Sequence, residues 1–176
     1  MKTAQHGFTM TELMAALAIL AVLVAIATPS LKQFAANSRI SASANSLVNA
    51  LAVARSEALH RSMPVSVCAS ANAQTCVDTA NWNSGWIVFT DNAGAQGSLD
   101  STDVLLQAWQ APGGGVTVNL NPVNNNKYIR FDARGMNSQL AAATFTVAAH
   151  DCRDNNASQI TVTPAGSPQS TKVACP

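Results

Sequence analysis

The chain has 176 residues, of which 48% are hydrophobic and only 11% are charged. This length suffices for one domain plus an extended element, and it excludes two ordinary domains. Low charge with ample apolar content argues against disorder, and a formal net charge of +1 excludes a strong overall field for nucleic acid.

The chain begins with a short polar segment, residues 1–7 (MKTAQHG), followed by a mainly apolar stretch from Phe8 to Thr28. At about 1.5 Å per residue this stretch forms a helix of roughly 31 Å, the thickness of the bilayer hydrocarbon. A secretory signal peptide would have more positive charge in front and a small-residue cleavage site behind, and no such site follows here. We therefore expect residues 8–29 to be a retained membrane span, with Lys2 keeping the leader cytoplasmic and the remainder of the chain translocated.

Glu12 places a carboxylate inside this stretch, where a charge costs on the order of 3 kcal/mol. In one interpretation it lies near the membrane surface and has no role. In the other, the chain is cut after Gly7, so that Phe8 carries a free amine and Glu12 lies one helical turn further on. Its carboxylate can then pair with the terminal ammonium of a neighbouring copy and set the register of a helical stack.

The segment GFTMTELM resembles the class III signal of type IV pilins and type II secretion pseudopilins, usually GFTLIEL, and departs from it at Met10 and Thr11. The resemblance implies cleavage between Gly7 and Phe8 by prepilin peptidase, N-methylation of Phe8 and a role for Glu12 in assembly. It also implies that the partners are the inner membrane, that peptidase, and other major or minor pilins or pseudopilins.

The helical pattern continues beyond the span, because the sequence from Leu31 to about Arg61 has no glycine or proline. We expect residues 30–62 to be an amphipathic continuation of the helix that packs on a sheet, with Met63-Pro64 ending it. A coiled-coil seam is the alternative, but alanine at many positions of the stripe argues against it. Apolar or small residues recur at helical spacing at Ile40, Ala44, Leu47, Leu51, Ala54 and Ala58.

Residues 63–176 form the second half of the chain, in which the apolar period changes to two. Turn-rich pieces such as APGGG and NPVNNN separate short β-prone runs, and no helix-length segment lies between them, which favours antiparallel pairing. The expected fold class is therefore α+β, with one long N-terminal helix packed on a C-terminal antiparallel β head of one or two sheets. The runs are Pro64–Ala69, Trp86–Thr90, Val104–Trp109, Val116–Leu120, Tyr128–Phe131, Thr144–Val147, Gln159–Thr163 and Thr171–Ala174.

The phrases LAVARSEALHRSMPVSVCAS, WNSGWIVFTD, IRFDARG and ATFTV resemble the GspH/FimT family of type IV minor pilins and type II secretion pseudopilins, in particular its FimT/FimU-like members. The resemblance implies a type IV pilin-like fold and a single-pass protein of the bacterial inner membrane with its head in the periplasm. It further implies a structural minor pilin that helps to initiate or cap a type IV pilus. A pseudopilin H of a type II secretion system is the alternative.

Four cysteines, Cys68, Cys76, Cys152 and Cys175, all lie outside the apolar stretch, which suits disulfides in an oxidising compartment. No two are close enough to form a CxxC zinc knuckle. Three pairings are possible. We favour Cys68–Cys76 and Cys152–Cys175 because each closes a local loop, and each such bridge contributes about 2–4 kcal/mol.

Nothing in the sequence indicates an enzyme, a cofactor or a metal site. His60 and His150 are not part of an HExxH motif, and GxSxG, P-loop and GxGxxG motifs are absent from the sequence. The loop at 90–103 (TDNAGAQGSLDSTD) weakly resembles a calcium loop, but it lacks the closing glutamate. We therefore interpret it as a hairpin turn.

Nucleic-acid binding is the remaining alternative function. Trp82, Trp86 and Trp109 have the chemistry to stack on bases, but tryptophans at strand positions more often fill the core. DNA-uptake members of the family carry a GRxR pattern near the C-terminus, where this chain has Gly166 within GSPQ and neither arginine. We therefore expect DNA binding to be weak or absent, since each lost cation removes a phosphate contact.

Overall fold

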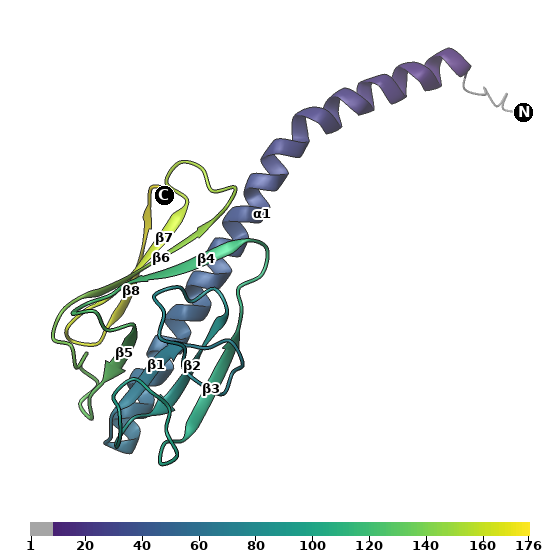
Figure 1. The fold of residues 1–176 in the computed structure, drawn as a ribbon. Coiled ribbons are helices and arrows are strands. Elements are labelled where there is room, and N and C mark those ends of the chain that lie inside the picture. The colour runs from purple at the N-terminus through teal and green to yellow at the C-terminus, as the bar shows by residue number, and fades with distance from the viewer. Residues whose placement is uncertain (1–8) are drawn as a thin grey trace, which may run out of the picture. The chain divides into compact units, whose positions relative to one another are not determined.

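The computed structural model describes residues 9–176, within which it has one helix and eight strands (Figure 1). The chain divides into two compact units, one ending at Ala35 and the other, called the head below, spanning Ala36–Pro176. The elements are α1 (Met10–Arg61), β1 (Val65–Ala69), β2 (Gly85–Thr90), β3 (Leu105–Gln110), β4 (Val116–Asn121), β5 (Tyr128–Phe131), β6 (Ala143–Ala149), β7 (Ala157–Val162) and β8 (Pro168–Val173).

Each of the eight predicted runs corresponds to one strand, with ends that differ by at most three residues, and the predicted α+β class is confirmed. The helix ends at Arg61. Ser62 follows with φ 53°, the left-handed conformation that commonly terminates helices. Pro64 then prevents any continuation of the helix, because its ring pushes the preceding Met63 out of the helical region.

The head contains two four-stranded sheets, and every strand pair in them is antiparallel. Sheet A has the order β3-β2-β1-β5, and sheet B has the order β4-β6-β7-β8. In sheet A, Val65 of β1 lies opposite Thr90 of β2 and Phe131 of β5. In Figure 1 the two sheets form separate groups of strands beside the C-terminal part of α1.

One apolar core joins the helix to both sheets of the head. The predicted helical stripe from Ile40 to Ala58 is buried, as are the inner faces of sheets A and B that contain Val67 and Phe145. The small side chains in this stripe allow the sheets to approach the helix backbone. Because the stripe is part of the core, it is not available as a coiled-coil seam.

Strands β1 and β2 depart from the predicted alternation, because all of their residues are buried. A second, smaller cluster covers their other face, where Cys68, Ile87 and Phe89 pack with partly buried Cys76 and Leu99. The loops that follow β1 and β2 supply this cover. The mainly apolar sequences VSVCA and GWIVF, in which Ser66 is the polar exception, therefore reflect burial on two sides.

Two hydrogen bonds connect the helix with the turn after β5 of sheet A, and that turn with the turn after β7 of sheet B. Arg55 Nε donates to the carbonyl of Gly135 at 3.1 Å, and the Asn137 N–H donates to the carbonyl of Pro164 at 3.0 Å. Gly166 has φ +77°, and a Cβ at this position would collide with the Gly135 carbonyl. The turn between β7 and β8 therefore requires glycine for close packing as well as for its conformation.

Candidate functional site

The N-terminal end of α1 is built around a threonine cap. The hydroxyl of Thr9 accepts a hydrogen bond from the Glu12 N–H at 3.3 Å, and the Thr9 carbonyl accepts one from the Leu13 N–H at 3.1 Å. Threonine is a preferred residue at this position. Glu12 lies in the first turn, where its charge is favourable to the helix dipole. Gly7 and Phe8, the residues of the predicted cleavage site, lie outside the described residues.

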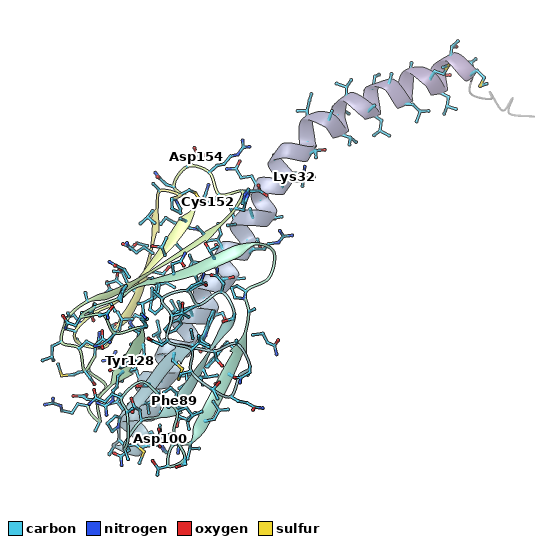
Figure 2. All side chains as sticks on the ribbon, in the orientation of Figure 1. Lys32, Phe89, Asp100, Tyr128, Cys152 and Asp154 are labelled. Atoms are coloured by element: carbon cyan, nitrogen blue, oxygen red, sulfur yellow. A yellow bond between two sulfur atoms is a disulfide. The ribbon has the colours of Figure 1, made fainter. Side chains whose placement is uncertain are left out.

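The first part of α1 is apolar on all sides, and none of its residues from Met10 to Thr28 is buried. Figure 2 shows these side chains standing out from the helix. Among the described residues, α1 is the one helix that is long and apolar enough to cross a membrane. A continuous apolar surface of this kind indicates contact with lipid or with another protein.

The helix continues without interruption through Pro29, although proline has no N–H to donate to the carbonyl four residues earlier. The two residues that flank Pro29 in the sequence donate hydrogen bonds from their hydroxyls to backbone carbonyls of the preceding turn. Thr28 Oγ1 donates to the Val24 carbonyl at 2.7 Å, and Ser30 Oγ donates to the Ala27 carbonyl at 2.9 Å. Polar side chains are thus accommodated in an apolar helix by bonding back to its own carbonyls.

All four cysteines form disulfides in the structure, with the local pairing that we favoured from the sequence. Cys68 of β1 bonds to Cys76 in the next loop, with 5.6 Å between the Cα atoms. Cys152, after β6, bonds to Cys175, after β8, with 5.8 Å between the Cα atoms. The second bridge ties the end of edge strand β8 to the end of β6, which lies two strands away in sheet B.

The loop between β2 and β3 is held together by its own carboxylates. Asp100 accepts hydrogen bonds from the N–H and the hydroxyl of Thr102. These two bonds are the largest causes that lower the pKa of Asp100 below its usual value. Asp103 accepts hydrogen bonds from the N–H groups of Asn92 and Asp100. These contacts are those of a turn, and the described residues include no group of three or more potential metal ligands.

Asp91 forms a buried network that the sequence analysis did not identify. Its carboxylate accepts hydrogen bonds from Ser66 Oγ at 2.5 Å, Arg130 Nε at 2.9 Å and the Gly97 N–H at 2.9 Å. The Asp91 and Arg130 side chains are 1% and 15% exposed. This network joins β1, β5 and the loop after β2. One feature of the sequence could have indicated this network. The alternation in IRF places Arg130 on the face of β5 opposite to Ile129 and Phe131.

The three tryptophans pack within the head, as predicted. Trp82 and Trp86 are buried in the core and Trp109 is partly buried against it, so none offers a free face of the kind that stacks on bases. The rings of Trp82 and Phe145 meet edge to face with 4.8 Å between their centroids. This geometry is favourable for aromatic pairs.

Comparisons with known proteins identify the family. The sequence matches the family described as type II transport protein GspH over residues 43–166 and the prokaryotic N-terminal methylation motif over residues 2–28. No curated protein matches the chain. The GspH match covers more than half of the chain.

Two solved structures of the minor pilin FimU show the same fold. The type IV minor pilin FimU of Pseudomonas aeruginosa, crystallised in space group P21, has a TM-score of 0.60 at 19% identity, covering 78% of this chain and 92% of FimU. A second FimU crystal form, P65, has a TM-score of 0.55 at 21% identity, covering 74% and 91%. The minor pseudopilin EpsH of the Vibrio cholerae type 2 secretion system has a TM-score of 0.48 at 13% identity, covering 77% and 97%. The chain therefore belongs to the GspH family of type IV minor pilins and type II secretion pseudopilins.

Proposed function

We propose that this chain is a structural minor pilin of a type IV pilus that assembles through its N-terminal helix and helps to initiate or cap the filament. The observation that carries this proposal is the exposed apolar segment of α1, which buries no side chain in its own chain. In the inner membrane, lipid covers this surface and the head lies in the periplasm. In the filament, the helices of neighbouring subunits replace the lipid. The protein acts by assembly and is not an enzyme.

The proposal divides the chain by task. Residues 1–7 are a leader that prepilin peptidase removes between Gly7 and Phe8, after which the new terminal amine of Phe8 is methylated. The match to the N-terminal methylation motif supports this processing. Residues 8–29 are the membrane span and filament core, residues 30–62 are the amphipathic continuation of the helix, and residues 63–176 carry the β head.

We propose that Glu12 sets the register between neighbouring subunits. It lies exposed on the first turn of α1, four residues along the sequence from the amine that cleavage would create. In an apolar bundle a carboxylate needs a partner, because an unpaired charge in such surroundings is costly. The terminal ammonium of an adjacent subunit provides that partner.

A pseudopilin H of a type II secretion system is the second candidate, because the matched family carries the description of a type II transport protein. Both candidates use the same leader and helix, so the effect of gene deletion distinguishes them. Loss of surface pili with normal protein secretion supports the minor pilin. Loss of secretion with intact pili supports the pseudopilin. A DNA-binding minor pilin is disfavoured, since the arginine pattern is absent from the C-terminal turn.

Glu12→Ala tests the assembly role in the full-length protein. We expect the variant to enter the membrane and to be processed normally, while its amount in sheared filaments falls at least tenfold, because the terminal ammonium loses its partner. Thr11→Ala, one residue away, is the matched control and should assemble normally.

Mass spectrometry of the membrane-extracted chain establishes whether processing occurred. The expected mature protein begins at N-methylated Phe8. A chain that retains Met1, or one cut after Ala27, would contradict the processing. Glu12→Ala incorporated at the normal level would contradict the pairing.

A further inference from the structure

The two sheets of the head have four edges, and these differ in how their outward backbone groups are satisfied. In an antiparallel ladder, successive residues direct their N–H and C=O groups alternately to one neighbour and to the other. Hydrogen bonds just beyond the ends of β1 and β2 show which residues of each strand face which neighbour. The Ser70 N–H donates to the Gly85 carbonyl and the Asp91 N–H to the Pro64 carbonyl, so the odd-numbered residues of β2 face β1.

Two of the edges are covered by other parts of the head. On the outer side of β5, the Ser138 N–H donates to the Arg130 carbonyl and Gln139 Nε2 donates to the Tyr128 carbonyl, both at 2.8 Å. On the outer side of β4, the Trp82 N–H donates to the Val118 carbonyl and Asn83 Oδ1 accepts from the Val118 N–H. Neither edge can accept a further strand without losing these bonds.

The third edge, β8, carries residues that discourage pairing. The Thr163 N–H donates to the Ser167 carbonyl, which fixes the alternation so that Pro168, Ser170 and Lys172 face outward along β8. Proline has no N–H to offer, and an edge lysine opposes an incoming strand.

The fourth edge, β3, has neither cover nor such a residue. Even-numbered Trp86 and Val88 of β2 face Trp109 and Gln107 of β3, so the backbone groups of Ala108 and Gln110 point outward. Within the described residues no hydrogen bond reaches them from outside sheet A. Residues 104–112 (VLLQAWQAP) have no charge, and proline occurs only after the strand ends.

A hollow of about 220 Å³ adjoins the end of this edge, lined by Ser43 and Ser46 of α1 together with Trp86, Gln110 and Pro112. The indole Nε1 of Trp86 is buried and has no acceptor among the described residues. A segment lying along β3 would pass beside this hollow.

We propose that the β3 edge is a strand-addition site, at which an extended, uncharged segment of a neighbouring filament subunit pairs with Ala108 and Gln110 as a fifth strand of sheet A. Free backbone groups on an edge are satisfied by another strand. The absence of charge on β3 favours an uncharged partner segment. The identity of the partner rests on the proposed function.

The partner segment is not β3 of a second copy. Pairing β3 with β3 is a two-fold, self-complementary contact that closes on itself. A filament requires contacts between different surfaces, which propagate from subunit to subunit. A different segment of the adjacent subunit therefore occupies the edge.

Site-specific photocrosslinking tests the site in the full-length protein in its own membranes. We place p-benzoylphenylalanine at Gln107, whose exposed side chain lies on β3, and at Thr171 on β8 as the matched control. We expect a single defined adduct from Gln107 and none from Thr171. Peptide sequencing of the adduct should identify a segment other than β3 in a subunit whose mature chain begins with an N-methylated residue.

Proline substitution tests whether backbone pairing holds the partner. Ala108→Pro removes an outward N–H without touching the bonds to β2, and Ser170→Pro makes the equivalent change in β8. We expect Ala108→Pro to lower the Gln107 adduct at least tenfold and Ser170→Pro to leave it unchanged. Equal melting temperatures of the two variants confirm that both are folded.

The outcomes separate this inference from the proposed function. No adduct at Gln107 while the chain is present in sheared filaments would overturn the strand-addition site and leave the minor pilin intact. An adduct that joins Gln107 to β3 of a second copy would overturn the assigned partner segment. Absence of the chain from every filament fraction would overturn the proposed function and the partner assignment with it.

Discussion

At the scale of single residues, Arg130 and Arg134 show what a sequence can and cannot reveal. They lie four residues apart in IRFDARG, and the sequence suggests only that Asp132 offsets one of them. In the structure Arg134 pairs with Asp132 at the surface, while Arg130 pairs with buried Asp91, thirty-nine residues away. The partner of Arg130 is set by strand order, which local sequence does not encode.

We expect the two arginines to differ in their effect on stability. Arg130→Ala leaves the Asp91 carboxylate buried and without its cation, which typically costs about 3–5 kcal/mol. Arg134→Ala removes an exposed pair worth about 0–1 kcal/mol. Urea unfolding of the head, residues 36–176, measures both. Equal losses for the two variants would show that the Asp91 network does not stabilise the head as described.

Asp132 should make stability depend on pH. Burial alone raises its pKa, but hydrogen bonds from the Met136 N–H and from Arg134 outweigh burial and hold the pKa below its usual value. A carboxyl with a lowered pKa stabilises the fold above its unfolded pKa of about 4, and this contribution is lost as the pH falls through the folded value. Asp132→Asn should therefore be less stable than wild type at pH 7, with a smaller difference near pH 3. Urea unfolding at the two pH values measures this change, and a difference that is independent of pH would contradict it.

At the scale of elements, all eight strands could be predicted at their places along the chain, because alternation and turn residues are local signals. Their order within the two sheets was not predicted. The limits of β8 could not be predicted. The prediction began at Thr171, whereas the strand begins at Pro168. A proline normally indicates a turn, but it is tolerated at an edge position whose N–H would face solvent. That position is known only when the strand order is known.

The two disulfides permit a prediction at this scale. In the chain-entropy model, closing loops of 8 and 23 residues contributes about 2.5 and 3.4 kcal/mol respectively. We therefore expect Cys152→Ala with Cys175→Ala to destabilise the head by about 1 kcal/mol more than Cys68→Ala with Cys76→Ala. Non-reducing peptide mapping establishes the pairing first. A peptide linking Cys68 to Cys152 or Cys175 would contradict the connectivity.

At the scale of the whole molecule, the sequence predicts a chain with two different environments. The segment from Met10 to Thr28 is apolar on all sides and buries nothing in its own chain. The head, in contrast, encloses a continuous core. Length and hydropathy were sufficient to predict this division, because they are additive properties of a segment. The uncovered β3 edge was not predictable, since it depends on which loops cover the other three edges.

We expect the head to bind duplex DNA only weakly. The chain has ten Lys and Arg against nine Asp and Glu, with nine against eight after Ser30. Because Lys32 lies before the head, the head itself has eight of each. Four of these eight cations already form ion pairs with carboxylates. In the turn before β8, Gly166 packs against Gly135, and Lys172 Nζ bonds to the Asn156 carbonyl at 3.3 Å. No cluster of free cations therefore faces outward at this turn.

A salt titration of binding to a short duplex measures this property. Non-specific binders typically show dissociation constants of about 10⁻⁴–10⁻⁶ M at physiological salt, and we expect the head to lie at the weak end of this range or beyond it. Ser167→Arg with Gln169→Arg is the matched variant, because it adds two phosphate contacts at the same turn. It should bind more tightly and steepen the salt dependence by about 0.9 per contact. Low-micromolar binding by the unaltered head at about 150 mM salt, lost steeply as the salt rises, would instead indicate a DNA-binding role.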